Sequence, residues 1–311
     1  MPFARTLQHI ALGSGLLLGL VLVYGCGSVN MHCNTAGPGY NCTQVTEAPP
    51  RHTRTPYQPV WSDEFHSVGT TKPQVSEAIV RMTNGERETK SLRPLQHDST
   101  LSRIACWHNQ DMLGHNYVGH EDSDDRMPSD RVAREHRRLI GIVGENAYRG
   151  GRLGPGASPD RKREWGRYIM DEWMDSPGHR ANILDHDWTH LGACVTQDSV
   201  QSRASQVFAD VYAYLDAPLP WTMPPGDSVS VSFSLTKAEA PPTRYQFVPA
   251  GQPLRDAFSG DDQGRSLNGT LHVPDAPGKY ELRVLIPTSQ DRYLPLGGPR
   301  VWVKPPDVPA Y

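Results

Sequence analysis

The stretch Trp173–Leu184, WMDSPGHRANIL, decides the expected fold. An amphipathic run that starts near Arg161 leads into this stretch and stops at Ser176–Gly178, where a proline cannot continue a helix. His179 follows directly after the break. The stretch therefore predicts a helix that ends beside a histidine, and the rest of the domain is interpreted outward from that point.

Two more helices are predicted upstream of this stretch. In the first, apolar residues recur at helical spacing before Gly85, and the second begins at Asp98 and Ser99, which are suitable capping residues. Short extended runs follow at residues 191–195 and 205–211. Residues 72–217 are therefore predicted to form an α+β domain with α-β-α layers. The apolar and helix-face residues at helical spacing are Val75, Ala78, Ile79, Met82, Leu101, Ile104, Ala105, His108 and Met112.

Residues 218–311 show a different pattern. After a proline-rich boundary at residues 218–225, apolar residues alternate with serine over Ser228–Leu235, and similar alternation occurs at residues 245–247 and 280–286. Asn268-Gly269 is a hairpin turn signal. The pattern predicts a small all-β sandwich of immunoglobulin-like type, which serves as an accessory domain.

The N-terminal residues 1–25 are typical of an export signal. Residues 10–24 are apolar but too few to span a membrane comfortably. Val23–Cys26 resembles a lipoprotein cleavage box, although Tyr24 stands where a small residue is usual, and a plain signal peptide is the alternative. Residues 26–71 are polar and rich in proline and predict a disordered tether. We expect an exported protein of the cell envelope, attached to the membrane if Cys26 carries lipid.

Four cysteines remain if Cys26 is lipidated, and they allow three pairings. A Cys33–Cys42 bond would close a small loop in the tether, and a Cys106–Cys194 bond would join two core elements. Unlinked buried thiols are the alternative for the second pair. Their spacing contains no CxxC or Cys/His zinc motif.

The charge balance excludes one class of partner. The formal net charge is −3, so no surplus of basic residues points to nucleic acid. Arg131 and Arg134–Arg138 form a basic helix face that we expect to face solvent.

Residues 74–216 contain three specific motifs, which are the WMxSPGHRxNIL run, the triplet Gly144–Asn146, and the stretch Asn116–His120. With these motifs, the segment resembles the bacterial form of the CAP superfamily, which contains cysteine-rich secretory proteins, antigen 5 and pathogenesis-related proteins. The resemblance implies an α-β-α sandwich with a cleft in which His120, Glu145 and His179 face one another. The further matching residues are Asn84, Arg87, Leu92–Leu95, Asp98, Ala105, His108, Asp111, Met112, Gly192 and Gln206–Phe208.

The cleft that the resemblance implies is incomplete in this chain. Many eukaryotic relatives carry a second Glu three residues after the tryptophan, where this chain has Ser176 with Asp175 beside it. His190 lies close by in sequence and is a further candidate neighbour of the cleft.

Three uses of His120, Glu145 and His179 remain open. They could hold a divalent cation such as Zn²⁺ with one open position, or act as a general base and acid. They could also form a buried hydrogen-bonded network that joins helices to sheet. We expect a domain that binds an extracellular lipid, cell-wall component, protein or cation. The alternatives are a hydrolase that uses these three residues and a structural or adhesive envelope lipoprotein.

Overall fold

The structure is a computed structural model that describes residues 68–237, 241–252, 267–288 and 293–305, and the main chain of 31–34 and 41–44. The predicted signal peptide, Cys26 and most of the predicted tether lie outside the described residues. Within the tether segment, β1 (Met31–Asn34) pairs antiparallel with β2 (Asn41–Gln44), and Cys33 lies opposite Cys42 in the register. Across the described parts of the chain, every helix is too short or too polar to cross a membrane.

The described chain contains five α-helices, and three of them confirm the predicted ones. Asp98 accepts hydrogen bonds from the N–H groups of Thr100 and Leu101 at 2.7 and 3.0 Å, so the predicted cap is present. Only Ser176 separates the fourth helix from the fifth, since Pro177 keeps the residue before it extended. The helices are α1 (Pro73–Glu88), α2 (Ser99–Gly114), α3 (Pro128–Glu135), α4 (Pro159–Asp175) and α5 (Pro177–Leu184).

The central sheet is built on the antiparallel order β5-β7-β6. The extended runs expected at 191–195 and 205–211 lie within β6 and β7. No strand was predicted at β5, because its glycines and polar residues interrupt the apolar alternation that marks a strand. These strands and their short neighbours are β3 (Thr70–Thr71), β4 (Gln96–His97), β5 (Leu139–Gly151), β6 (His190–Gln197) and β7 (Gln201–Leu215).

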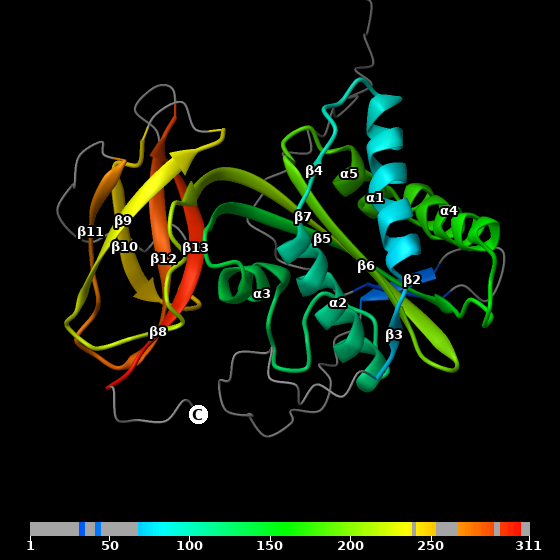
Figure 1. The fold of residues 1–311 in the computed structure, drawn as a ribbon, viewed down its shortest axis with the longest axis horizontal. Helices are drawn as coiled ribbons and strands as arrows, with labels where there is room; N and C mark the ends of the chain where they lie inside the picture. The colour runs from blue at the N-terminus through cyan, green and yellow to red at the C-terminus, as the bar shows by residue number, and fades with distance from the viewer. Residues whose placement is uncertain are drawn as a thin grey trace, which may run out of the picture.

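Helices cover both faces of this sheet, as the α-β-α prediction requires (Figure 1). On one face, α2 and α3 pack against alternate residues of β5, β6 and β7, among them Cys194 and Val207. On the other face, α1, α4 and α5 pack against Ala193, Val195 and Phe208. A disulfide joins Cys106 of α2 to Cys194 of β6, which decides one pairing that the sequence left open.

The C-terminal strands form a second core with the ends of β5 and β7. Val231 and Phe233 are buried there with Ile140 and Leu215. β7 pairs with β9, and β13 meets β5 at Gly141, so the two predicted domains share one sheet. The strands are β8 (Thr222–Met223), β9 (Ser228–Leu235), β10 (Arg244–Pro249), β11 (Asn268–His272), β12 (Gly278–Pro287) and β13 (Tyr293–Val303).

The predicted hairpin turn at Asn268-Gly269 is wrong. Both residues lie in β11, where they pair with Ser232 and Val231 of β9. A Cβ at position 269 would lie 1.5 Å from the hydroxyl of Tyr245. Glycine is therefore needed here because a side chain packs against its backbone, not because the chain turns.

Candidate functional site

Glu145 lies within β5, and its side chain is only 1% exposed. Its Oε2 accepts a 2.6 Å hydrogen bond from Nη2 of Arg131 in α3, and its Oε1 lies 3.0 Å from Nδ1 of His120. Burial alone would raise the pKa of this carboxyl, but the charge of Arg131, with those of His108 and His120, holds the pKa at about 2. Glu145 is therefore ionised at neutral pH and has no proton to donate.

His120 follows α2 and is held in one tautomer by this carboxylate. An ionised Glu145 can only accept, so Nδ1 of His120 carries the proton and donates it. In the neutral ring, Nε2 then carries a lone pair, and no partner for this nitrogen is described. The side chain is 26% exposed, so Nε2 is available to a ligand.

His179 lies in the first turn of α5 and brings a second imidazole to this place. Burial, with the nearby charge of His120, lowers the pKa of His179 to about 4, so its ring is neutral at pH 7. Among the described contacts, none involves its ring nitrogens. The site thus presents two imidazole rings, of which that of His179 is neutral, beside a buried ion pair.

Two asparagines fix α5 against the edge of β5. Asn146 donates to the carbonyl of His179 at 3.1 Å, and Asn182 donates to the carbonyl of Glu145 at 3.2 Å and to the side chain of Asn146 at 2.9 Å. Within the described sheet, β13 pairs with β5 only at Gly141, so these amides occupy an edge that no strand covers. These hydrogen bonds hold the start of α5, which contains His179, close to the backbone of Glu145.

Arg131 is a site residue that the sequence motifs did not reveal. It was expected on a solvent-facing basic surface, but its side chain is 1% exposed, and Arg134 and Arg137 are also buried. Its Nη1 donates to the carbonyls of His120 and Arg126 at 2.7 Å each. A buried carboxylate needs a counter-charge, so the arginines closely preceding Glu145 in sequence were the available signal.

His108 of α2 completes the buried part of the site. It donates from Nε2 to the carbonyl of Gly119 at 2.8 Å, and the same nitrogen lies 3.6 Å from Oε1 of Glu145. Burial, followed by the charge of Arg131, lowers its pKa to about 4. His108 is therefore a neutral positioning group with no access to solvent.

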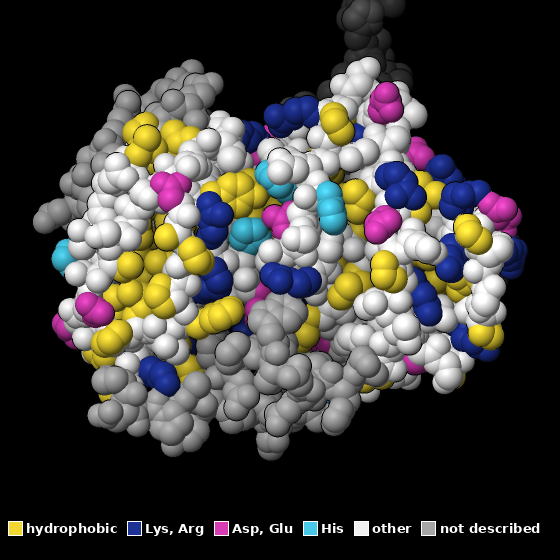
Figure 2. Space-filling view, in the orientation of Figure 1, with side chains coloured by type: hydrophobic (Ala, Val, Ile, Leu, Met, Phe, Trp, Pro, Cys, Tyr) yellow, Lys and Arg dark blue, Asp and Glu magenta, His cyan; other side chains and the backbone are white. Residues whose placement is uncertain are grey.

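The other predicted neighbours lie elsewhere or make no described contact with the site. Asp175 is exposed at the end of α4, and Ser176 connects α4 to α5. His190 is bonded through Nδ1 to Thr189 Oγ1 at 2.8 Å, and its ring packs against Tyr214. It belongs with the ion pair of Asp98 and His136, which are 3.2 Å apart. On the surface that faces the viewer, Figure 2 shows histidine side chains gathered beside an acidic side chain near the middle of the molecule.

The geometry does not favour the predicted three-ligand zinc site. In the described part of the chain, the one group of three whose ligand atoms all lie within 4.8 Å is Asp185, His186 and Asp187, of which Asp185 is half-buried and the other two are exposed. Both oxygens of Glu145 are already engaged, and Arg131 places a positive charge beside them. Zinc binding by His120, Glu145 and His179 stays a prediction.

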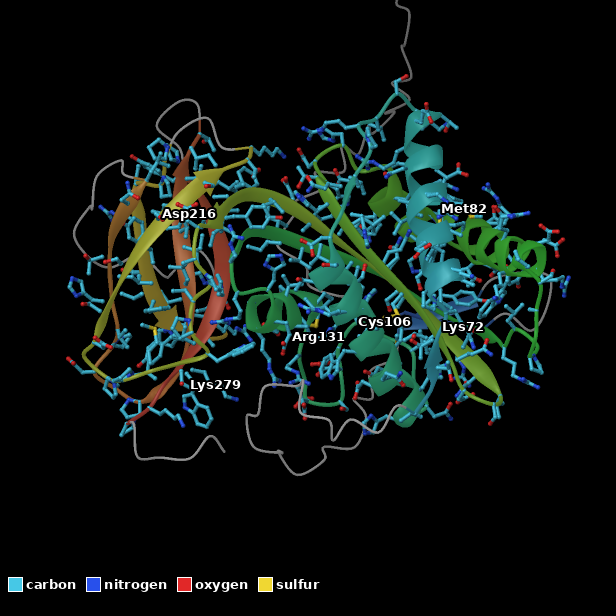
Figure 3. The ribbon with its side chains drawn as sticks, in the orientation of Figure 1. Lys72, Met82, Cys106, Arg131, Asp216 and Lys279 are labelled. Carbon is cyan, nitrogen blue, oxygen red and sulfur yellow. A yellow bond between two sulfur atoms is a disulfide. The ribbon has the colours of Figure 1, made fainter. Side chains whose placement is uncertain are left out.

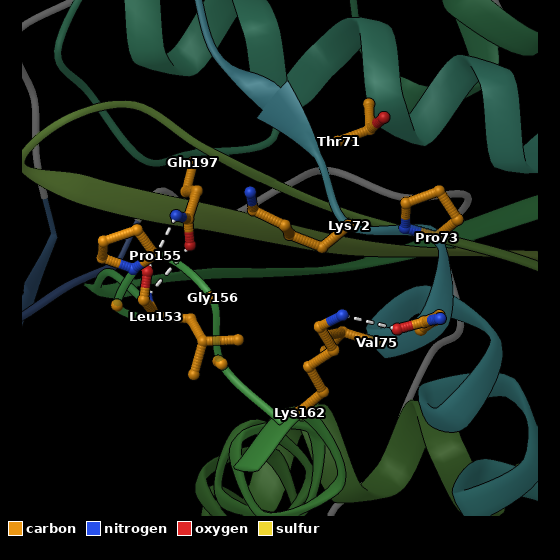
Figure 4. Close-up of a pocket in the computed structure, with 12 residues that line it drawn as sticks. Thr71, Lys72, Pro73, Val75, Leu153, Pro155, Gly156, Lys162 and Gln197 are labelled. Atoms are coloured by element: carbon orange, nitrogen blue, oxygen red, sulfur yellow. Dashed lines mark hydrogen bonds between the residues drawn. The ribbon is translucent and has the colours of Figure 1, made fainter. Parts of the chain in front are cut away.

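Two cavities are described, and neither contains these residues. One of about 450 Å³ lies between the starts of α1 and α4, where Lys162 donates to Gln74 at 2.7 Å (Figure 4). The other, of about 500 Å³, lies beside β9 and β11.

Comparison with a protein-family model supports the resemblance found in the sequence. The model of the CAP family, described as the cysteine-rich secretory protein family, matches residues 80–212. This part of the chain is a CAP domain. The matched residues contain His108, His120, Arg131, Glu145 and His179, whereas β8–β13 lie beyond the match.

Two curated relatives from Bacillus subtilis strain 168 match the CAP domain. The uncharacterized protein YkwD is 35% identical over 118 residues, which are 37% of this chain and 39% of that protein. The uncharacterized membrane protein YlbC is 28% identical over 136 residues, which are 44% of this chain and 35% of that protein. The match thus spans less than two fifths of the length of either relative.

Solved structures of bacterial proteins are also similar. An outer surface protein from Borrelia burgdorferi has a TM-score of 0.37 and 15% identity, covering 46% of this chain and 98% of that chain. An extracellular protein containing a SCP domain from Bacillus anthracis str. Ames has a TM-score of 0.36 and 25% identity, covering 44% of this chain and 41% of that chain.

Proposed function

We propose that the CAP domain works outside the cytoplasm and binds a polar component of the cell wall through the rings of His120 and His179. The observation that carries the proposal is the pair of imidazole rings whose outer nitrogens have no described partner, with His179 held neutral by its burial. Such nitrogens accept hydrogen bonds from hydroxyl and amide groups, which peptides and glycans carry in number. The ion pair of Glu145 and Arg131 supports the site by holding His120 in one tautomer.

Calorimetry with soluble muropeptide fragments tests this ligand class. Replacing either histidine, in His120→Ala or His179→Ala, removes one hydrogen bond to the ligand, so we expect about a tenfold loss of affinity in each. His97→Ala is the matched control, since His97 is exposed on β4 and bonds to Ser102 instead. Equal affinity of all four proteins, or binding of phospholipid vesicles in place of the fragments, would overturn the proposal.

Hydrolysis of peptide or glycan bonds is a second candidate. The observation in its favour is the contact between His120 Nδ1 and Glu145, which leaves Nε2 as a base that could activate water. Glu145 cannot be the acid, because its pKa is about 2. Turnover of cell-wall fragments that falls at least about a hundredfold in Glu145→Gln would support this role. Turnover that persists in a folded Glu145→Gln protein would exclude it.

Export and lipid attachment complete the proposal and depend on the apolar residues 10–24 and on Cys26. Labelled palmitate supplied to the producing cells should enter the protein and be lost in Cys26→Ser. A labelled Cys26→Ser protein would contradict attachment at this residue.

A further inference from the structure

The C-terminal β-domain, defined here as β8–β13, makes direct ionic contact with the helix that carries Arg131. Arg300 of β13 pairs with Asp130 of α3, the residue next to Arg131, and its Nε donates to Glu281 of β12 at 2.9 Å. Figure 1 shows α3 between β13 and α2, and Figure 3 labels Arg131 close to α3. The accessory strands therefore reach to within one residue of the candidate site.

Asp130 connects this contact to the start of α3. Its Oδ2 accepts a hydrogen bond from the N–H of Met127 at 2.9 Å, which fixes the first turn of the helix. Its Oδ1 accepts from Arg300. One carboxylate thus ties the first turn of α3 to the face of β13.

The last turn of α3 is tied to the same part of the molecule. Arg137, just beyond the helix, donates to the carbonyls of Leu219 and Pro220 at 2.9 and 2.8 Å, and Trp221 donates to the carbonyl of Arg134 at 3.1 Å. With only eight residues, α3 is too short to be stable alone, so its position depends on tertiary contacts, and these contacts add to its packing on α2 and the sheet.

The position of α3 in turn decides the geometry around Glu145. Arg131 donates from the middle of α3 to Glu145 and to the carbonyl of His120. A displacement of the helix by about 1 Å would lengthen both contacts beyond good hydrogen-bond distance. His120 would then lose the ionised and oriented acceptor that fixes its tautomer.

We propose that the C-terminal β-domain sets the tautomer and orientation of His120, with Arg300 as a positioning residue that acts through Asp130 and α3 on Arg131. This inference rests on the proposed function in taking His120 as a ligand-contacting residue. It gives the β-domain a role that the family match to residues 80–212 does not contain.

Nitrogen NMR of the full chain without ligand tests the inference, because ring nitrogens report the tautomer directly. In the natural protein we expect His120 to be protonated at Nδ1 and the Arg131 Nη protons to exchange slowly. In Arg300→Gln we expect Nε2-protonated His120 to appear and Arg131 exchange to speed up about tenfold, the weakening of one charge-assisted hydrogen bond. Arg300→Lys should restore part of the natural signature.

Arg244→Gln is the matched control, since it removes an arginine from β10, for which no contact with α3 is described. If Arg300→Gln does not fold, Asp130→Asn decides, because asparagine still accepts from Met127 but loses the charge that Arg300 meets. A natural His120 signature in the folded variant overturns the inference. Because no ligand is present, failure of muropeptide binding would contradict the proposed function and leave this result standing.

Discussion

The ion pair of Arg131 and Glu145 is the residue-level feature on which the site depends. Both side chains are 1% exposed, so removing one partner leaves an uncompensated charge in the interior. We expect Arg131→Met to lower the free energy of unfolding by about 3–5 kcal/mol. The double variant Arg131→Met with Glu145→Gln should recover much of this loss, because no buried charge remains. Urea unfolding at pH 7 measures both.

Arg161→Met is the control for this experiment. Arg161 and Glu164 form an exposed pair at 3.0 Å, with side chains 71% and 63% exposed. Exposed pairs contribute about 0–1 kcal/mol. If the free energy of unfolding of Arg131→Met were no lower than that of Arg161→Met, the buried ion pair would not contribute to stability.

The buried histidines make stability depend on pH. The pKa values of His108 and His179 fall from 6.5 to about 4 on folding, so the unfolded chain binds more protons between these values. Their contribution to stability is complete above pH 6.5 and is lost as the pH falls toward 4. His179→Gln cannot take up a proton there, so it should lose less stability than the natural protein between pH 7.5 and 4.5.

Urea midpoints at the two pH values measure this difference. His186→Gln is the control, because the side chain of His186 is 80% exposed and should leave the loss unchanged. An identical loss in His179→Gln would show that His179 is not held neutral by the fold.

At the level of elements, two glycines should respond in opposite ways to alanine. A Cβ on Gly192 of β6 would lie 2.2 Å from the backbone nitrogen of Ser102, so α2 packs directly on this glycine. We expect Gly192→Ala to displace α2 and to cost about 1–3 kcal/mol. Gly85 lies inside α1 with nothing within 4 Å of its Cβ position. Gly85→Ala should therefore stabilise by about 0.5–1 kcal/mol.

Thermal unfolding of the two variants checks this contrast. A more stable Gly192→Ala protein would show that α2 does not lie this close to β6. The need for glycine at position 192 arises from the packing of α2 on β6, so it can be recognised in the folded structure and not in the sequence.

At the scale of the whole molecule, the Cys106–Cys194 disulfide links segments 88 residues apart. Such a bond removes loop-closure entropy from the unfolded chain. Cys106→Ala with Cys194→Ala should lower the free energy of unfolding by about 2–5 kcal/mol, measured by urea unfolding under non-reducing conditions. If reducing agent lowered the stability of the double variant as much as that of the natural protein, another bond would carry the effect.

Three of the five described helices and the C-terminal alternating strands could be predicted because their patterns are local. Apolar spacing marks α1, α2 and α4, and alternation with serine marks β9. β5 could not be predicted in this way, since its pairing with β7 depends on residues about 50 to 75 positions away in sequence. The hairpin signal at Asn268-Gly269 failed for the same reason, because Tyr245 decides what fits there.

The candidate site also contains residues that the sequence motifs revealed and a residue that only the structure revealed. The motifs pointed to His120, Glu145 and His179, and the structure joins the first two directly and sets the third close enough to His120 for their charges to interact. Arg131 could not be recognised from spacing, because an arginine on a short helix is expected to face solvent until a buried carboxylate is placed against it. His190, near the motif in sequence, lies instead with Asp98, His136 and Tyr214.

The order of residues by itself determined the CAP motifs, three of the helices and the candidates His120, Glu145 and His179, because side-chain type and spacing can be recognised without the fold. Protonation state, tautomer and charge pairing were decided only by the folded molecule, since burial and neighbours from distant segments set them. The role of β13 beside α3 belongs to this second class, because residues 130 and 300 meet only after the whole sheet has formed.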